Sequence, residues 1–286
     1  MRTSTLIALA LPALSSAAAL SLEKLLSKHP KLSTFHDLLT QFDLLDDFKG
    51  YDNITIVAPT NQAYLDLANW GFNVSEVPAP VARALLTYHV LQGEHTLDSL
   101  SSQQQVVHTY LKPPVLTNVT DGAAVKLSRD NSGKIITQSG LGVYGSVEEA
   151  DIAFTHGVLH TLNSSMVLPH NITLTAEING LTKFLDLMSE AGLVEEFEAL
   201  KDVTVFIPQN AALEKLLWLM KLLPKENLAS VLKYHVVPNK VLYEAAVEDE
   251  EDHETLDGGV VRLSSGRSGD LRVNGVKVLH FMYIKY

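Results

Sequence analysis

The sequence predicts an α+β protein made of two tandem copies of one domain. Several segments of the first half recur in the second half in the same order. Within each copy, segments with helical spacing of apolar residues come first and β-branched runs come later. Because helices and strands are separated along the chain instead of alternating, the order favours an α+β domain over βαβ units.

Four pairs of segments define the repeat. Two pairs are offset by 149 residues, one by 146 and one by 136: Leu32–Phe48 with Leu181–Phe197, Ile54–Ala63 with Val203–Ala212, Leu86–Val90 with Leu232–Val236, and Asp121–Ser128 with Asp257–Ser264. A period this long is typical of globular domains and not of solenoid repeats. We therefore predict one domain over residues 20–169 and a second, with shorter loops, over residues 170–286.

The first copy opens with predicted helices around one short strand. Leu32–Phe48 has apolar residues at helical spacing, and Pro80–His89 places a proline in the first helical turn. Between them, Ile54–Val57 is a β-branched run that a proline soon ends, which predicts a buried strand. Gln62–Leu67 predicts a short helix, for which Asn61 is a candidate N-cap.

Later segments of the first copy predict strands. Two apolar runs flank Asp130–Gly133, a turn signal that indicates a hairpin, and Ile152–Phe154 and Val158–Leu162 are further strand candidates. Gly140–Gly145 matches a G-x-G-x-x-G pattern without the acidic residue that a dinucleotide site needs downstream, so a glycine-rich connection is favoured. In the second copy, Leu213–Leu223 predicts an apolar helix packed in the core, with a partner-facing surface as the alternative.

The N-terminus predicts a secretory signal peptide over residues 1–19. Arg2 gives a positive start, Leu6–Leu14 is apolar, and Ser15–Ala19 offers small residues for cleavage. A signal anchor is the alternative, but the apolar run is short against the ~20 residues that span a bilayer. We expect no transmembrane segment in the rest of the chain and no GPI anchor.

Composition excludes several classes of function. The 286 residues include no cysteine, which excludes disulfides, zinc–thiolate sites, iron–sulfur clusters and thiol nucleophiles. The formal net charge of −11 disfavours binding to nucleic-acid phosphates. The sequence contains no nucleophile-elbow or zinc-protease motif, and His156 and His160 have no third metal ligand nearby. We therefore expect no enzyme activity, no metal and no cofactor.

Five Asn-x-Ser/Thr sequons support the secretory interpretation, because glycans are added in the secretory lumen. The candidate glycosylation residues are Asn53, Asn73, Asn118, Asn163 and Asn171. The first three are expected next to turns or loops, so we predict occupancy at most of them. Asn163 adjoins a strand candidate and is a less favourable site.

These segments resemble the motifs of the fasciclin domain family. The family's first signature, a strand followed by Ala-Pro-Thr-Asn and an aromatic residue, is similar to Thr55–Tyr64. In the second copy, Thr204–Leu213 keeps its proline and asparagine but loses the threonine and the aromatic residue. The family's Tyr-His pair occurs in each copy, as Tyr88 with His89 and as Tyr234 with His235.

The last signature of the family is matched only in the first copy. There it resembles Ala150–Ile152 followed by His156–Asn163, whereas His280–Tyr286 in the second copy matches none of it. The second domain is therefore predicted to be C-terminally incomplete. Because the missing part corresponds to two strand candidates, we expect this domain to be loosened or to continue in a longer chain.

The resemblance implies a compact domain in which a wedge of β-strands is flanked by helices. It also implies adhesion through protein or glycan contacts, without a catalytic centre. In some animal relatives, the Tyr-His and Asp-Ile pairs resemble integrin contacts. The candidate binding residues here are Tyr88, His89, Asp151, Ile152, Tyr234 and His235. The alternative is structural, because a buried, hydrogen-bonded His89 would fix its helix on the sheet.

Together these features predict a secreted or cell-surface glycoprotein that mediates adhesion, or binds extracellular matrix or cell wall, through tandem fasciclin-like modules. Its expected partners are extracellular or surface proteins and glycans. The alternative is a protein of the vacuolar or endomembrane lumen that assists membrane fusion or trafficking. Both need a signal peptide and glycans, so localisation distinguishes them.

Overall fold

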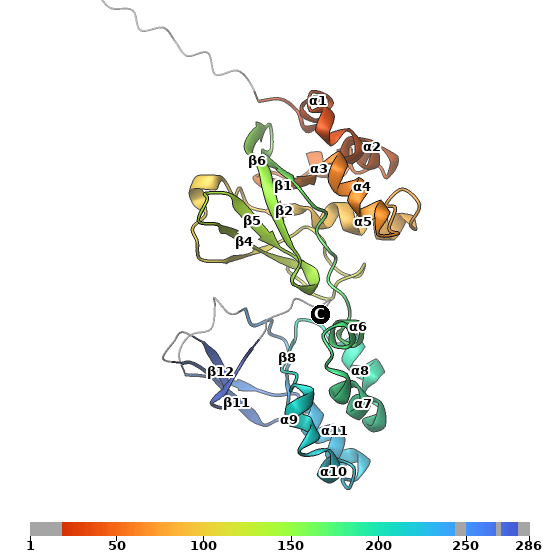
Figure 1. Cartoon of the computed structure of the whole chain (residues 1–286), viewed down its shortest axis with the longest axis vertical. Coiled ribbons are helices and arrows are strands. Elements are labelled where there is room, and N and C mark those ends of the chain that lie inside the picture. Colours follow the sequence, from red (N-terminus) through yellow and green to blue (C-terminus); the bar gives the residue numbers. More distant parts are fainter. Residues whose placement is uncertain (1–18, 244–249, 267–269, 280–286) are drawn as a thin grey trace, which may run out of the picture.

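The computed structural model describes residues 19–243, 250–266 and 270–279. The chain forms two units that follow one another along the long axis of the molecule (Figure 1). In each unit the helices lie on one side and the strands on the other. The predicted signal peptide, apart from its last residue, and the segment His280–Tyr286 lie outside the described residues.

The first unit begins with helices that surround one strand. The α-helices are α1 (Leu22–Ser27), α2 (Ser33–Gln41), α3 (Leu45–Lys49), α4 (Asn61–Asn69) and α5 (Ala79–Tyr88), and short 3-10 helices span Pro30–Leu32, Leu97–Ser99 and Gly140–Gly142. The prediction of one helix over Leu32–Phe48 is wrong, because Asp43 has φ 51° and separates α2 from α3. A left-handed residue cannot continue a right-handed helix. The N–H of Leu44 donates to the carbonyl of Leu39 (2.9 Å) and closes the end of α2.

The asparagine of the repeated Pro-x-Asn motif, Asn61 in the first unit and Asn210 in the second, forms structural hydrogen bonds. Thr60, and not the predicted Asn61, caps α4, and its hydroxyl accepts a backbone N–H at 3.4 Å. The Asn61 amide instead accepts from the N–H of Thr34 and donates to the carbonyl of Pro30, both at 2.9 Å. Asn210 makes the two equivalent bonds in the second unit, at 3.0 and 2.7 Å. The motif therefore joins two helix starts in each unit.

The strands of the first unit form one seven-stranded sheet. They are β1 (Ile54–Pro59), β2 (Val90–Gln92), β3 (Gln105–His108), β4 (Ala124–Arg129), β5 (Ile135–Gln138), β6 (Tyr144–Phe154) and β7 (Gly157–Leu162). The order is β2-β1-β7-β6-β5-β4-β3. Only β1 and β7 pair in parallel, and the β4–β5 hairpin encloses the turn expected at Asp130–Gly133. The predicted strands near Ile152 and Val158 are therefore present as β6 and β7.

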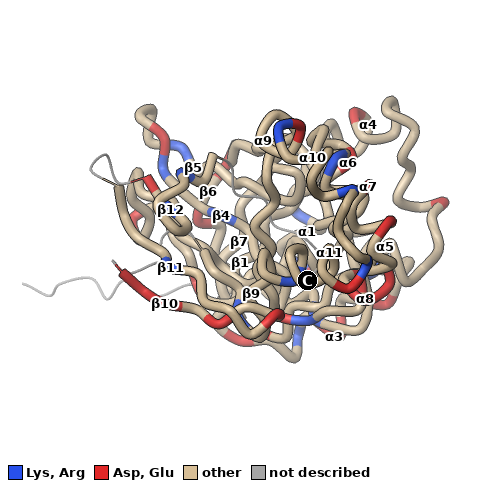
Figure 2. The backbone as a smooth tube through the Cα atoms, turned by 90° about the horizontal axis from the view of Figure 1, so that it is seen from below, with Lys and Arg blue, Asp and Glu red and all other residues tan. Residues whose placement is uncertain are grey.

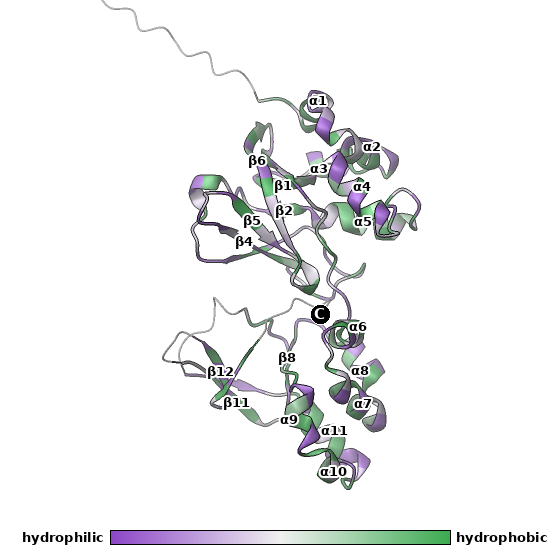
Figure 3. Cartoon of the chain, viewed as in Figure 1, coloured by the Kyte–Doolittle hydropathy of each residue, from purple (hydrophilic) through white to green (hydrophobic). Residues whose placement is uncertain are grey.

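Two apolar clusters cover opposite faces of this sheet. Phe35 of α2 packs with Ile56 and Leu159 in the cluster on the helical side. Val57 belongs with Tyr88 to the other cluster. Neighbouring residues of β1 enter different clusters because successive side chains of a strand point to opposite faces. Figure 3 colours the chain by hydropathy and shows that helices and strands of both units contain both apolar and polar residues.

The second unit repeats the order of elements with shorter strands. Its helices are α6 (Ile172–Ile178), α7 (Thr182–Ala191), α8 (Val194–Ala199), α9 (Asn210–Glu214), α10 (Leu217–Met220) and α11 (Lys225–Lys233). Its described strands are β8 (Thr204–Val205), β9 (Val236–Val237), β10 (Glu251–Glu254), β11 (Val260–Ser265), β12 (Leu271–Val273) and β13 (Val276–Lys277). They form two separate sheets, β8-β9 and β10-β11-β12-β13. The mixed α+β architecture predicted for both halves is present.

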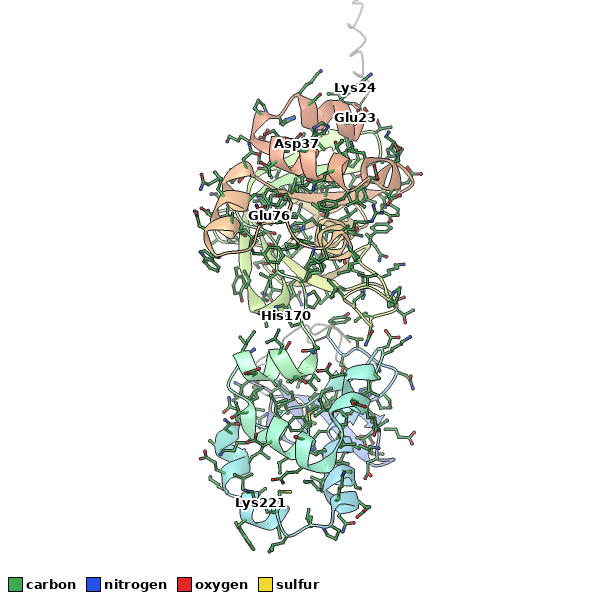
Figure 4. All side chains as sticks on the ribbon, turned by 90° about the vertical axis from the view of Figure 1, so that its right-hand side faces the viewer. Glu23, Lys24, Asp37, Glu76, His170 and Lys221 are labelled. Atoms are coloured by element: carbon green, nitrogen blue, oxygen red, sulfur yellow. The ribbon has the colours of Figure 1, made fainter. Side chains whose placement is uncertain are left out.

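The apolar segment Leu213–Leu223 does not form one core helix. It is divided between α9 and α10, and only part of it is buried. Leu213 lies in the core, but Trp218 is 67% exposed and Leu222 is 72% exposed. The expectation of core packing is therefore wrong for these two residues. Figure 4 shows Lys221, from the same segment, at the far end of the second unit.

One loop from each unit joins the two units. The backbone N–H and the hydroxyl of Thr120 both donate to the carboxylate of Asp202, at 2.7 and 2.5 Å. The amide of Asn118 donates to the carbonyl of Leu200 at 2.9 Å. The linking segment near His170 passes between the units (Figure 4). The contact thus connects a loop before β4 with the loop before β8.

The surface carries a mixture of charges. Lys and Arg positions lie among Asp and Glu positions along the backbone trace (Figure 2). Exposed ion pairs such as Lys49 with Asp46 (2.7 Å) and Arg262 with Asp252 (2.7 Å) contribute little stability each. Across the described residues, we find no helix with the length and apolarity needed to cross a membrane.

Candidate binding site

The tyrosine of each Tyr-His pair ties a helix to the sheet. Tyr88 is the last residue of α5 and is fully buried, and its hydroxyl donates to the carbonyl of Ala124 on β4 at 3.0 Å. Burial raises the pKa of this phenol. Tyr234, directly after α11, makes the equivalent bond to the carbonyl of Val260 on β11 at 2.8 Å. The same side chain therefore anchors the same helix in both units.

His89 is a buried, fully bonded imidazole. Its Nδ1 lies 2.8 Å from the carbonyl of Leu85, to which it donates, and its Nε2 accepts from the backbone N–H of Met166 at 2.9 Å. This pair of bonds requires the neutral ring with hydrogen on Nδ1. Burial lowers the pKa of His89 to about 4. With no exposed surface, the ring offers no atom to a partner of the folded protein.

His235 keeps only part of this arrangement. Its Nδ1 donates to the carbonyl of Val231 at 2.8 Å, but the side chain is half-buried. Burial lowers its pKa as well. The ring contacts Phe184 edge to face, with centroids 6.2 Å apart. The Tyr-His pair of the second unit is therefore more accessible than that of the first.

Beside His235 lies an apolar cavity of about 130 Å³. Phe184, Leu213 and Leu232 contribute to its lining. In the first unit, the repeat places Tyr64 where the second unit has Leu213, and Tyr64 is a buried member of the helical-side cluster. We therefore attribute the cavity to the loss of the aromatic residue in the second copy of the motif.

Asp151 lies at an irregularity in β6. The register between β6 and β7 shifts between Glu149 and Ile152, and Asp151 adopts φ 60°. Its exposed carboxylate accepts from the N–H of Leu97 at 3.0 Å. The backbone N–H of Asp151 donates to Nδ1 of His160 at 3.0 Å. The bulge thus turns the carboxylate towards a neighbouring loop while the ladder continues on both sides.

The side chain of His160 fixes this bulge through a hydrogen bond at each of its two ring nitrogens. It is buried, and its Nε2 lies 2.8 Å from the carbonyl of His95, to which it donates. Because Nδ1 accepts from Asp151, the ring is neutral with hydrogen on Nε2. Burial lowers its pKa. Sequence reasoning considered His160 only as a metal ligand and missed this role, which depends on a contact across two strands.

The candidate residues do not converge on one site in the first unit. Tyr88 bonds to β4, and His89 bonds to the segment after β7. Asp151 bonds instead to the 3-10 segment at Leu97, and Ile152 is half-buried against the helical-side cluster. Of these residues, only Asp151 presents an exposed polar group.

The candidate glycosylation residues differ in exposure and in whether the amide nitrogen Nδ2 already donates a hydrogen bond within the protein. Asn53 is exposed at a left-handed turn position, and Asn163 is exposed with its amide oxygen accepting from the N–H of Ser146 at 2.8 Å. Asn73 is exposed, but its Nδ2 donates to Glu76 at 2.7 Å.

Asn118 and Asn171 are more restricted. Both are half-buried. The Nδ2 of Asn118 donates across the domain contact to Leu200, and that of Asn171 donates to Glu198 at 2.8 Å. The amide oxygen of Asn171 also caps α6. Since a glycan is attached at Nδ2, these two positions would lose native contacts on modification.

Sequence reasoning did not identify Trp70, and for the segment Leu213–Leu223, which contains Trp218, it gave a partner-facing surface only as the alternative to core packing. The chain has two tryptophans, and both are exposed: Trp70 at 89%, directly after α4, and Trp218 at 67%, in α10. Trp70 follows α4, whereas Trp218 lies in α10, beyond the α9 helix that the repeat equates with α4. The available signal for Trp218 was the apolar run Leu213–Leu223, and Trp70 had no comparable signal.

The described residues hold no group of three or more His, Asp or Glu side chains that could bind a metal ion. The structure does offer an exposed carboxylate, the exposed aromatic rings of Trp70, Tyr144 and Trp218, and exposed asparagines, which are groups for contact and for modification.

Comparison with known proteins identifies the family. Over 281 residues the chain is 59% identical to a fasciclin-like arabinogalactan protein of Phaeosphaeria nodorum, an alignment that covers 98% of this chain and 88% of that protein. It is 41% identical over 279 residues to a fasciclin-like arabinogalactan protein of Cercospora beticola, covering 96% of this chain and 75% of that protein.

A solved structure and a family match complete the comparison. The structure of a FAS1 domain pair from the insect cell adhesion molecule Fasciclin I aligns with a TM-score of 0.42 and 16% identity, covering 86% of this chain and 88% of that one. The fasciclin domain matches residues 30–169 and 179–284. Two matched segments and close relatives over nearly the whole length show that the chain belongs to the fasciclin domain family.

Proposed function

We propose that the protein is a secreted or cell-surface glycoprotein that binds extracellular matrix or cell-wall material through its two fasciclin domains. Membership of an adhesion-type family supports an adhesion or matrix role in general terms. The proposal adds an extracellular location and a binding mechanism, in which two similar modules each make weak contacts. Linking two such modules raises the effective concentration of the second once the first is bound.

The observation that carries the proposal is the pair of exposed tryptophans. Trp70, directly after α4, and Trp218, in α10, give each domain one exposed tryptophan. Tryptophan supplies a large contact area at a low cost in conformational entropy and is enriched among residues that dominate binding energy. Because the Tyr88-His89 pair is buried, we assign it a structural role and assign contact to the tryptophans, with Asp151 as an exposed polar candidate.

The glycoprotein part of the proposal rests on the exposed sequons. Asn53, Asn73 and Asn163 lie on the surface, where a glycan fits without disturbing the core. We assign the chain no catalytic activity, because the exposed groups are suited to contact and the histidines of the motifs are used in internal hydrogen bonds.

A retention experiment tests the proposal. The purified full chain is incubated with washed cell-wall or matrix material of the producing organism, and bound protein is measured against concentration. Trp70→Ala and Trp218→Ala should each weaken apparent binding by roughly 30-fold, since an interface tryptophan commonly supplies about 2 kcal/mol. The double variant should lose the advantage of two linked modules and bind more weakly than either single variant.

Tyr144→Ala is the matched control, because Tyr144 is also an exposed aromatic residue, at 61%, but lies on the strand side. It should bind like the unchanged chain. Equal binding by the unchanged chain and the double tryptophan variant would contradict the assignment of contact to the tryptophans. No retention of the unchanged chain would contradict the proposed function.

A further inference from the structure

One end of the second domain carries apolar side chains that the domain does not cover. In the segment Lys215–Lys225, here called the α10 surface, Trp218 is 67% exposed, Leu219 is 41% exposed and Leu222 is 72% exposed. The other face of the segment is also apolar and packs against the core of the domain, through Leu217, Met220 and Leu223. A helical segment that is apolar on both faces needs a partner on each, and an apolar surface of this kind marks a contact site.

This exposure belongs to the helical half of the domain and not to its sheet. α10 lies between α9 and α11, on the helical side of the unit (Figure 1). In the first domain, β7 and the segment after it are described, and Trp70 is nevertheless 89% exposed directly after α4, the helix that the repeat equates with α9. A completed sheet therefore leaves this part of the fold at the surface.

The backbone of the α10 surface already makes hydrogen bonds within the segment. The N–H groups of Leu219 and Leu222 donate to carbonyls three residues earlier, both at 3.0 Å, and that of Lys221 donates four residues earlier, also at 3.0 Å. Peptide groups that are paired within helical turns can enter an apolar medium, whereas unpaired groups cannot. The exposed apolar side chains can therefore leave water without a loss of backbone hydrogen bonds.

Lysines accompany these apolar side chains. Residues 215–225 include Lys215, Lys221 and Lys225 and no acidic residue, in a chain whose formal net charge is −11. All three lysines are exposed, and Glu214 and Glu226 border the segment. Among the ion pairs of the described residues, none involves these lysines. Their charges are therefore available to an anionic partner.

The other exposed tryptophan has the opposite charge beside it. The segment of residues 61–78, which contains Trp70, includes Asp66 and Glu76 and no Lys or Arg. An anionic surface therefore attracts the segment around Trp218 and repels the one around Trp70. The two tryptophans of this chain are thus suited to different partners.

We propose that the α10 surface binds a lipid membrane with anionic headgroups. Trp218, Leu219 and Leu222 enter the boundary between headgroups and acyl chains, and the lysines remain at the level of the headgroups. Interfacial helical elements bury their apolar face about 5–10 Å deep. Tryptophan is enriched at that boundary, and a lysine stem covers apolar surface while its charge stays in water.

The position of α10 suits a flat partner. α10 lies at the end of the long axis opposite α1, so a membrane can reach it without meeting the first domain (Figure 1). The proposal adds a lipid partner to the binding of wall or matrix material and does not depend on that binding.

A vesicle-binding experiment tests the proposal. The full chain is incubated with vesicles of phosphatidylcholine and phosphatidylglycerol in equal parts, or of phosphatidylcholine alone, and bound protein is measured against lipid concentration. We expect saturable binding to the anionic vesicles and at least about tenfold weaker binding to the neutral ones, because each lysine near an anionic surface contributes about fivefold to affinity. Added salt should weaken binding to the anionic vesicles.

Substitutions at both ends of the molecule locate the contact. Trp218→Ala should weaken binding to anionic vesicles by at least about tenfold, and Lys221→Gln by about fivefold. Lys24→Gln is the matched control, because Lys24 is exposed at the opposite end of the molecule (Figure 4), and it should bind like the unchanged chain. All three side chains are exposed, so the variants should unfold at the same temperature as the unchanged chain.

Tryptophan fluorescence gives a second readout, because the chain has only two tryptophans. Trp70→Phe leaves Trp218 as the emitter, and its emission should shift to the blue on anionic vesicles. Trp218→Phe leaves Trp70, whose emission should not shift. Absence of binding to anionic vesicles overturns the proposal, as does binding that Trp218→Ala and Lys221→Gln leave unchanged, or a blue shift from Trp70 alone.

The outcome separates this proposal from the proposed function. Retention on wall or matrix material that Trp218→Ala weakens, without any binding to vesicles, would assign the α10 surface to that material and overturn the lipid proposal. Binding to anionic vesicles without retention on wall or matrix material would support the lipid proposal and contradict the proposed function.

Discussion

At the scale of single residues, the Tyr-His pair shows how a motif that resembles a binding site can be part of the core. In the first domain, both side chains are fully buried and every polar atom of His89 is bonded. The sequence is compatible with a binding role and with a structural role for His89, because a helix end followed by a strand can place a histidine either inside or at the surface. Only the bond from Met166, 77 residues away, distinguishes them.

His89 should make the first domain sensitive to acid. Its pKa of about 4 in the folded chain lies below the ~6.5 of a free imidazole, so the unfolded chain binds more protons between these values. Stability is therefore complete above pH 6.5 and falls as pH decreases, by about 3 kcal/mol at pH 4. Urea unfolding of the first domain at pH 7 and pH 4 measures this loss.

Two variants complete that measurement. His89→Gln removes the titrating group and should flatten this part of the pH dependence, although it lowers stability at pH 7 by roughly 1–3 kcal/mol through imperfect bonding. His36→Gln, at a half-buried position of α2, is the matched control for the substitution itself. A pH dependence that is the same in the unchanged chain and in His89→Gln would contradict the buried neutral ring.

Glycan occupancy should follow the freedom of each amide nitrogen. We predict high occupancy at Asn53 and Asn163, intermediate occupancy at Asn73, and the lowest at Asn118 and Asn171, whose Nδ2 atoms donate to Leu200 and Glu198. This order differs from the one expected from sequence alone, because a sequon does not show what its amide contacts. Glycopeptide mass spectrometry after endoglycosidase treatment gives the occupancy of each site. Equal or higher occupancy at Asn118 than at Asn53 would be the contrary result.

At the scale of elements, local pattern predicted most helices and strands but not their breaks or distant pairings. Periodicity over Leu32–Phe48 showed which side chains are apolar, but the break at Asp43 depends on one backbone conformation. The β4–β5 hairpin was predictable, because its turn signal and both strands are adjacent in sequence. The parallel pairing of β1 with β7 joins segments about one hundred residues apart, and no local pattern encodes it.

The cavity of the second domain gives a prediction for α9. Leu213→Phe restores an aromatic ring at the position where the first domain has Tyr64 and should fill part of the space of about 130 Å³. We expect the second domain to gain roughly 0.5–2 kcal/mol. Phenylalanine is chosen over tyrosine because the hydroxyl of Tyr64 is buried without a hydrogen-bond partner.

Thermal unfolding of the full chain measures this gain as a higher Tm for the unfolding of the second domain. Leu213→Ala is the opposite variant and should cost about 2–5 kcal/mol by enlarging the cavity. If Leu213→Phe lowers the Tm, the space is too small or wrongly shaped for a ring, and the explanation of the cavity by the missing aromatic residue fails.

At the scale of the whole molecule, the domain contact was not predictable from sequence. Thr120 and Asp202 are 82 residues apart, and each is an ordinary loop residue. The repeat places Asp202 where the first domain has Asn53, and both adopt a left-handed conformation, at φ 51° and 56°. The same turn therefore serves as a surface site in one domain and as a contact in the other.

Asp202→Gly should loosen this contact without straining the backbone, because glycine accepts the left-handed conformation. Loss of the two bonds from Thr120 should speed proteolytic cleavage of the linking segment near His170 by roughly tenfold. Asn53→Gly, made in an unglycosylated chain, is the matched control and should leave cleavage unchanged. Equal cleavage rates for both variants would mean that this contact does not hold the domains together.

The most direct test of the proposed extracellular adhesion role is the location of the protein in its own cells. An epitope inserted in the exposed turn between Asp130 and Gly133 leaves both ends of the chain unchanged. Cells are fractionated into medium, wall and surface, and vacuolar lumen, and the epitope is measured in each with and without endoglycosidase. We predict that it is in the medium, wall and surface fractions and that its apparent mass falls on treatment. Epitope confined to the vacuolar lumen would contradict the account and favour a role in membrane fusion or trafficking.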